Sequence, residues 1–340
     1  MGIGRCGVCL MVVLGMGTTL ARGEAQSWEL QNGQWRPVGG EASTRPVSDA
    51  TLDRAELLLT HNGYVAAMNM MLTWIKQNKK SPLMDRAILL LAESYFQNGD
   101  RLTAFYECDH LMDDFSDSPL YYRALEMQYK IAEEFLDGYR RRLFGMAVLS
   151  AEGEAVEMLY RIQQRSPGSP LAEKALLRTA DYYYATSQFD LSGDTYTAYV
   201  KQYPRSPMVP RARLRAAFSS LAQFRGLPYD ATPLLDARTQ LIDLAMAYPD
   251  LAKEENLEDV MQRIDKSFAR KILHTANFYV RTHDRASAVY QYRFLMQAYP
   301  DSPEAQEAKQ ALAKMPASAM KNSPPPTGGD YAPATQPSVE

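Results

Sequence analysis

The stretch HTANFYVRTHDRASAVYQYRFLMQAYPDSP, at His274–Pro303, decides the fold. Apolar residues recur at the spacing of one helix face on both sides of a short polar break. Tyr299 closes the second of these segments, and Pro300 prevents its continuation because proline has no backbone N–H donor. The stretch therefore predicts a helix–turn–helix unit over Arg270–Val280 and Arg285–Tyr299.

A proline junction like the one that ends this stretch recurs along the chain. Its copies are separated by 37 to 51 residues, and periods in this range are typical of stacked helix pairs. In each full copy a Ser can cap the following helix, and the next Pro fits the first turn of that helix. The copies read QNKKSPL from Gln77, DFSDSPL from Asp114, RSPGSPL from Arg165, QYPRSPM from Gln202 and AYPDSPE from Ala298, with a degenerate AYPDLAK from Ala247.

The residues inside the units resemble the tetratricopeptide consensus. In that consensus a small residue and an aromatic lie three apart on the first helix, and one small and two larger residues follow on the second. We therefore expect an all-α fold, a tetratricopeptide-type superhelix of about five to six helix pairs over residues 48–315. Three units match in register: Ala276, Tyr279, Ala288, Tyr292, Leu295 and Pro300; Ala180, Tyr183, Ser192, Tyr196, Tyr199 and Pro204; and Ala92, Tyr95, Ala104, Cys108, Leu111 and Ser116.

Three units depart from the shortest period. The third holds extra residues around Gly138–Gly153, and the fifth carries Phe224–Leu235 between its helices. The sixth has an unusually long first helix, expected over Glu254–Arg281. Insertions at helix corners usually lie on one face of a repeat array, which is often the binding face.

The amino-terminal segments precede the repeats. Residues 1–25 have the layout of a secretory signal, in which Arg5 stands before an apolar run that is short for a membrane-spanning helix. An uncleaved anchor is the alternative interpretation of this segment. Residues 26–47 form a leader in which an Asn-Gly pair favours a β-hairpin within Trp28–Trp35.

Composition limits the function classes. The formal net charge is −3, which leaves no electrostatic footprint for nucleic acid. Cys108 is the single cysteine beyond the signal segment, so no internal disulfide is expected and the core must supply the stability. Residues 316–340 are rich in Pro, Gly, Ser and Thr and predict a disordered tail.

No arrangement of residues indicates catalysis. The histidines form no HExxH pattern, and the chain has no Gly-rich phosphate loop and no GxSxG motif. The best metal candidate is His110 with Asp113 and Asp114, although a solvated helix face is the favoured interpretation of these residues. Cys108 occupies a packing position, where an inert buried thiol is expected. We therefore predict no catalytic residue, no cofactor and no metal site.

Partner-binding residues are expected on two surfaces. First-helix positions that face away from the core would line the concave groove of a repeat superhelix. The compact basic run inside the third unit could contact an acidic partner or lipid headgroups, with a solvated corner as the alternative. The candidate residues are Arg86, Glu93, Phe96 and Gln97 on the first surface and Arg140, Arg141 and Arg142 on the second.

The junctions and unit lengths together resemble the BamD (YfiO) family of outer membrane protein assembly factors, which are periplasmic tetratricopeptide lipoproteins. The resemblance covers nearly all of Ser48–Met315. It implies a non-catalytic scaffold that assists assembly and insertion of outer-membrane β-barrel proteins and binds assembly partners or unfolded barrel substrates. The expanded third unit contributes Glu154, Ala155, Leu159, Ile162, Pro167, Ser169 and Pro170 to the match.

The expected location is the periplasm, with association at the inner face of the outer membrane through a partner. The cysteine of the family's lipobox has no counterpart at the end of the apolar run, so no acylation site is expected. One alternative function is a periplasmic tetratricopeptide coordinator of envelope or cell-division machinery. An enzyme on a helical-repeat scaffold is disfavoured, because no catalytic constellation accompanies the repeats.

Overall fold

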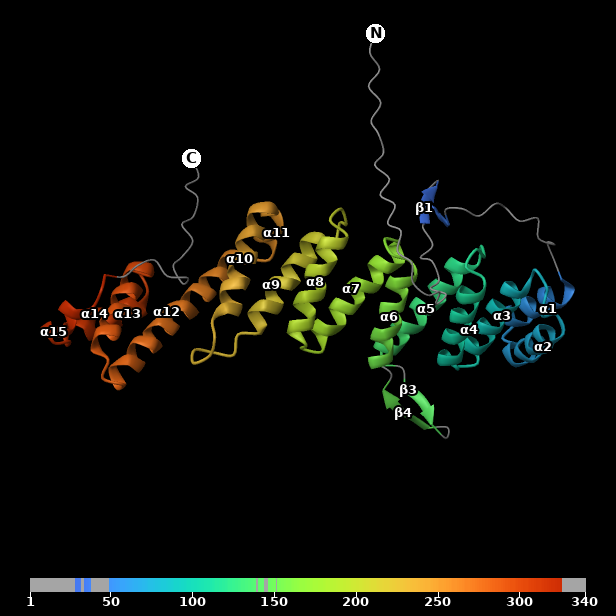
Figure 1. The fold of residues 1–340 in the computed structure, drawn as a ribbon, viewed down its shortest axis with the longest axis horizontal. Helices are drawn as coiled ribbons and strands as arrows, with labels where there is room; N and C mark the ends of the chain where they lie inside the picture. The colour runs from blue at the N-terminus through green and yellow to red at the C-terminus, as the bar shows by residue number, and fades with distance from the viewer. Residues whose placement is uncertain are drawn as a thin grey trace, which may run out of the picture. The chain divides into compact units, whose positions relative to one another are not determined.

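The computed structural model describes residues 28–31, 34–37, 49–138, 140–143, 146–150 and 152–325. The chain divides into two compact units, Met1–Gln128 (unit 1) and Tyr129–Glu340 (unit 2). Helices dominate both units, and the colour gradient in Figure 1 follows them in chain order.

Unit 1 is built from helix pairs. In the first pair α1 packs against α2, and in the second α3 packs against α4. The two pairs join because α3 also contacts both α1 and α2. The helices are α1 (Ala50–Thr60), α2 (Tyr64–Gln77), α3 (Met84–Gln97), α4 (Arg101–Asp114) and the beginning of α5 (Tyr121–Leu136).

Unit 2 continues the same pattern. Each helix from α6 to α10 packs against the next, and α12 contacts α10, α11, α13 and α14. The helices are α6 (Glu152–Arg165), α7 (Pro170–Ala185), α8 (Phe189–Gln202), α9 (Val209–Ala222), α10 (Thr232–Ala247), α11 (Pro249–Glu254), α12 (Leu257–Arg281), α13 (Arg285–Ala298), α14 (Pro303–Ala313) and α15 (Ala317–Asn322).

The consensus positions form the core, as the spacing predicts. The small residues let paired helices approach closely, and the larger residues fill the space beside them. Burying one Leu- or Tyr-sized side chain stabilises a fold by about 2 kcal/mol. The tetratricopeptide-type fold is therefore confirmed by twelve positions that are at most 2% exposed: Ala92, Ala104, Cys108, Leu111, Ala180, Ser192, Tyr196, Tyr199, Ala276, Ala288, Tyr292 and Leu295.

The junction serines cap helices in two different ways. Ser169 and Ser302 are the N-caps of α7 and α14, and each hydroxyl accepts the backbone N–H three residues later at 3.1 Å. Pro170 and Pro303 then occupy the first turn, as predicted. In the other full copies the helix begins two residues after the Pro. In these copies the junction Ser hydroxyl accepts a hydrogen bond from the backbone N–H two residues later. The Ser therefore caps the turn that precedes the helix, and not the helix itself. The three residues are Ser81, Ser118 and Ser206.

Two antiparallel hairpins accompany the helices. The first pairs β1 (Trp28–Gln31) with β2 (Gln34–Pro37) and confirms the hairpin predicted in the leader. The second pairs β3 (Arg140–Leu143) with β4 (Met146–Ser150) inside the insertion of the third unit. Sequence reasoning placed extra residues there without a strand pairing. The register shift between Arg141 and Arg142 interrupts the alternation that would have signalled it.

Two boundaries differ from the prediction. The long helix begins at Leu257 and not at Glu254, because Asn256 adopts a left-handed φ of 50° that separates α11 from α12. A short helix, α15, occupies part of the segment expected to be disordered from Pro316. It packs against α13, where Ala319 is buried and Arg293 donates to the Met320 carbonyl. Residues 326–340 of the predicted tail lie outside the described residues.

Candidate functional site

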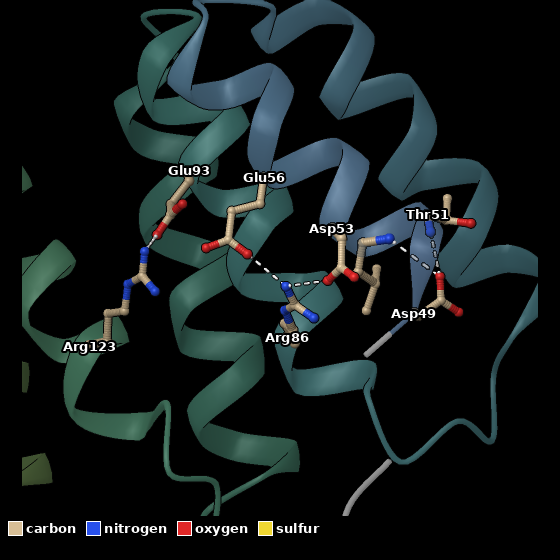
Figure 2. A network of polar contacts seen from close by, with 8 residues as sticks. Asp49, Thr51, Asp53, Glu56, Arg86, Glu93 and Arg123 are labelled. Carbon is tan, nitrogen blue, oxygen red and sulfur yellow. Dashed lines mark hydrogen bonds and ion pairs between the residues drawn. The ribbon is translucent and has the colours of Figure 1, made fainter. Parts of the chain in front are cut away.

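Arg86 and Glu93, both predicted to bind a partner, belong to a row of charges on the first helices of unit 1. We call this row the unit 1 ladder, and Figure 2 shows it. Arg86 of α3 contacts Asp53 at 2.9 Å and Glu56 at 2.6 Å, both from α1. Glu93 of α3 contacts Arg123 of α5 at 2.7 Å. The ladder thus links successive first helices through their own side chains.

The ladder is only partly exposed to water. The Glu93 side chain is 17% exposed, whereas Arg123 is 55% exposed. Burial raises the pKa of the Glu93 carboxyl, the Arg123 guanidinium opposes this shift, and the nearby Glu56 carboxylate adds to it. Ion pairs with this degree of exposure contribute about 0–1 kcal/mol each. The row therefore contributes little to the stability of unit 1.

The other two residues predicted for this surface lie at the carboxyl end of α3. Phe96 is half-buried, and the Arg101 guanidinium lies 4.1 Å from the centre of its ring. Gln97 is exposed. The structure therefore brings Arg86 and Glu93 into one row and leaves Phe96 and Gln97 beside its end.

The predicted basic run lies in the second hairpin. Arg140, Arg141 and Arg142 are three of the four residues of β3, opposite Ser150, Leu149 and Ala147 of β4. Their side chains lie outside the described part of the chain, so their role in binding stays a prediction.

Sequence reasoning missed the recurrence of the ladder position. The fifth residue after the junction Ser is Arg86, Arg123, Lys174, Arg211 and Glu307 in successive full copies. The residue that follows the small consensus position of the first helix is Glu93, Asp181 or Asn277. Reading these two positions together would have indicated the Glu93–Arg123 pair, but it would also have paired Asp181 with Arg211.

In unit 2 the equivalent of the Glu93–Arg123 pair is absent. Asp181 of α7 accepts a hydrogen bond of 2.5 Å from the hydroxyl of Tyr196 in α8. Burial and this hydrogen bond raise the pKa of Tyr196, so the phenol remains protonated and donates. Among the described residues no carboxylate lies within 4.0 Å of the Arg211 guanidinium. The unit 1 residue equivalent to Tyr196 is Cys108, which has no such hydroxyl.

A surface hollow of about 170 Å³ lies at this unpaired position. Arg215, one helical turn after Arg211, stacks over the Tyr184 ring at 4.6 Å. Its guanidinium also makes no ion pair within the described parts of the chain. The lining residues come from α7, α8, α9 and the turn before α9: Leu177, Asp181, Tyr196, Met208, Arg211, Ala212 and Arg215.

A third version of the same position occurs between α12 and α13. There the Tyr292 hydroxyl donates to Asn277 at 2.5 Å, and the next first helix carries Glu307 in place of Arg. These three copies therefore differ in chemistry at one repeat position: an ion pair, an arginine beside a carboxylate that is held by a tyrosine, and a neutral amide.

The remaining chemical candidates are surface or core residues. His110 contacts Glu107 at 3.6 Å and Asp114 at 3.0 Å on the exposed side of α4. Within the described ranges, no three His, Cys, Asp or Glu residues are grouped so that they could hold a metal ion. Cys108 is fully buried beside Met127, and burial raises the pKa of its thiol. Of the helices that the structure describes, none is long and apolar enough to cross a membrane.

Stacked helix pairs with buried consensus positions and polar first-helix surfaces define a tetratricopeptide-type repeat protein. A family model described as YfiO, outer membrane lipoprotein, matches residues 149–321. The chain belongs to this family. Members of the family with this repeat fold are typically non-catalytic scaffolds that bind other proteins, and the family description is consistent with a place in the cell envelope.

Solved structures with similar repeats share little sequence with this chain. TPR-like repeats from Podosopora anserina are 14% identical, with 61% of this chain and 95% of that chain covered and a TM-score of 0.31. The C-terminal part of a TPR repeat-containing protein from Cytophaga hutchinsonii is 12% identical, with 76% and 98% covered and a TM-score of 0.24. No curated protein matches the sequence.

Proposed function

We propose that this protein is a non-catalytic periplasmic scaffold that assists the assembly and insertion of outer-membrane β-barrel proteins. The observation that carries the proposal is the family match over residues 149–321, which covers most of the helix pairs of unit 2. Repeat arrays present long surfaces that bind extended partners without a catalytic centre. The signal layout of residues 1–25 supports export to the compartment in which such a scaffold acts.

The unit 1 ladder suggests how part of the surface contributes. Its three carboxylates outnumber its two guanidinium groups, so the row is acidic on balance. Asp53 and Glu56 remain 49% exposed, and Gln97 adds exposed hydrogen-bonding groups at the end of α3. We expect this face to contact basic or polar segments of a barrel-assembly partner, with the β3 arginines as a separate basic contact.

The test is recovery of the partner from intact envelopes. Cells that produce the affinity-tagged full chain are crosslinked, the membranes are solubilised, and proteins retained with the tag are identified by mass spectrometry. We expect a large outer-membrane β-barrel protein among them. Recovery of the chain alone from the soluble periplasm would contradict the proposal, and recovery with cell-division proteins would support the coordinator role instead.

The contribution of unit 1 is tested separately. A double variant, Asp53→Asn with Glu56→Gln, removes the two exposed carboxylates and should weaken retention of the barrel partner severalfold if this face binds it. Asp117→Asn with Glu126→Gln is the matched control, since it makes the same charge change at two exposed residues outside the ladder. Unchanged retention by the first double variant would remove this face from the proposed binding surface.

A further inference from the structure

The hollow between α7 and α9 contains a binding position that the chain itself does not fill. At the two earlier arginines of the series, the guanidinium holds a carboxylate from the preceding first helix: Asp53 and Glu56 for Arg86, and Glu93 for Arg123. The repeat geometry therefore places this arginine where a carboxylate binds. Arg211 occupies the same position, with no carboxylate of the described chain in contact.

The reason for this difference is local and chemical. Asp181 stands where Glu93 stands in unit 1, but its side chain is one methylene shorter. Its carboxylate is also engaged by the buried Tyr196 hydroxyl at 2.5 Å, which holds it toward α8. In unit 1 the residue at the Tyr196 position is Cys108, so Glu93 is free to reach Arg123. Tyr in place of Cys, together with the shorter Asp side chain, thus leaves Arg211 without an ion-pair partner among the described residues.

Two guanidinium groups then face one small hollow. Arg211 is exposed, and Arg215 is held in place by stacking on Tyr184. Leu177 and Met208 add apolar walls to the hollow. Planar guanidinium groups form paired hydrogen bonds with carboxylates, and these charge-assisted bonds are stronger than neutral ones. The chemistry of the hollow fits an acidic side chain that has an apolar neighbour.

We propose that Arg211 and Arg215 bind a carboxylate of an acidic, partly apolar segment of a partner polypeptide, which seats its apolar residue against Leu177 and Met208. The proposal rests on the protein-binding role proposed above and specifies one site of that role. The acidic face of unit 1 would not bind such a segment, so the two faces select segments of opposite charge.

The experiment is a titration of the purified full chain with short fluorescein-labelled peptides, followed by fluorescence anisotropy. One peptide alternates Glu and Leu with Ser spacers, and its control replaces each Glu by Gln. We expect binding of the Glu peptide, and about tenfold weaker binding to an Arg211→Gln, Arg215→Gln double variant, as for the loss of a charge-assisted hydrogen bond. Asp181→Asn should strengthen binding about twofold or more, because it removes a nearby negative charge.

An Arg205→Gln, Arg213→Gln double variant is the matched control, because it removes the same two charges at exposed residues that do not line the hollow. It should alter the affinity less than about twofold. Equal weakening by this control would show attraction to the net charge and overturn the site. Equal binding of the Gln peptide, or failure of the Glu peptide to bind, would overturn it as well.

The site and the broader function fail in distinguishable ways. If the natural chain recovers the outer-membrane barrel partner but does not bind the Glu peptide, the scaffold function stands and this site is wrong. If the Glu peptide binds as expected and no barrel protein is recovered from envelopes, the site stands and the assembly function is wrong.

Discussion

The α3–α5 surface of unit 1 and the α7–α9 surface of unit 2 use one repeat position in opposite ways. In unit 1, Glu93 and Arg123 satisfy each other at 2.7 Å. In unit 2, Asp181 turns to Tyr196 and leaves Arg211 without a carboxylate partner among the described residues. The comparison teaches that a buried residue, Cys or Tyr, and the length of one acidic side chain together determine whether the arginine at this position is paired within the chain.

The largest loss of stability should come from truncating the side chain of Tyr196, which differs from Cys108 at the equivalent position. Tyr196→Ala removes a buried aromatic and should lower the free energy of unfolding of its unit by about 3–5 kcal/mol. Cys108→Ala, at the equivalent position, should cost only about 1 kcal/mol. Urea unfolding followed by circular dichroism measures both. Equal losses would mean that the two positions do not differ in packing.

A smaller change should convert the unit 2 surface into the unit 1 type. Tyr196→Phe keeps the ring and removes the hydroxyl, so we expect a loss of about 1–2 kcal/mol from the hydrogen bond to Asp181. The freed carboxylate should then pair with Arg211. A double-mutant cycle between Asp181→Asn and Arg211→Gln should show coupling near zero in the natural background and about 0.5 kcal/mol in the Phe background. Coupling of the same size in both backgrounds would refute the comparison.

The paired and unpaired arginines should differ in their contribution to stability. Arg123→Gln leaves the half-buried Glu93 carboxylate without its partner and should cost about 1 kcal/mol. Arg211→Gln should change the free energy of unfolding by only a few tenths of a kcal/mol, since it breaks no ion pair within the described chain. Thermal unfolding of the two single variants measures this contrast, and a larger loss from Arg211→Gln would reverse it.

The smallest effect is a dependence on pH that arises at Glu93 of the unit 1 ladder. Burial raises the pKa of Glu93, so the folded chain binds this proton more readily than the unfolded chain. The stability of the natural protein relative to Glu93→Gln should therefore rise as pH falls through the folded pKa, which lies above the ordinary value of a Glu carboxyl. This gain in stability should be lost as pH rises through the folded pKa. A difference that grows with increasing pH would contradict this assignment.

The helix pairs could be predicted because the residues that define each helix and its ends lie close together in the sequence. The small size of Ala276 and Ala288 predicts close helix packing. Ser302 followed by Pro303 predicts the start of a helix, because Ser caps it and Pro fits its first turn. The ion pairs could not be predicted in this way. Whether Asp181 reaches Arg211 depends on a third residue, Tyr196, from another helix, and on the length of one side chain.

The same reasoning applies to the predicted partner-binding residues, whose role stays a prediction. Helical spacing indicated that Arg86 and Glu93 lie on the first-helix surface, and both belong to the unit 1 ladder. Their partners on neighbouring first helices, Asp53, Glu56 and Arg123, depend on the register between helix pairs, which spacing within one helix does not report. The basic run over Arg140–Arg142 lies in a strand because the insertion forms a hairpin, and no helical period could indicate that.

The helix α12 has a mechanical consequence. It runs without Pro or Gly through 25 residues, which is about 37 Å, and it contacts α10 and α11 as well as α13 and α14. A continuous helix resists bending, because every bend must distort several backbone hydrogen bonds at once. A displacement of α10 and α11, for example by a bound partner, should therefore be transmitted to α13 and α14 as a rotation of the rigid helix α12. This end of unit 2 would act as a lever, in which contacts made at one end reposition the other.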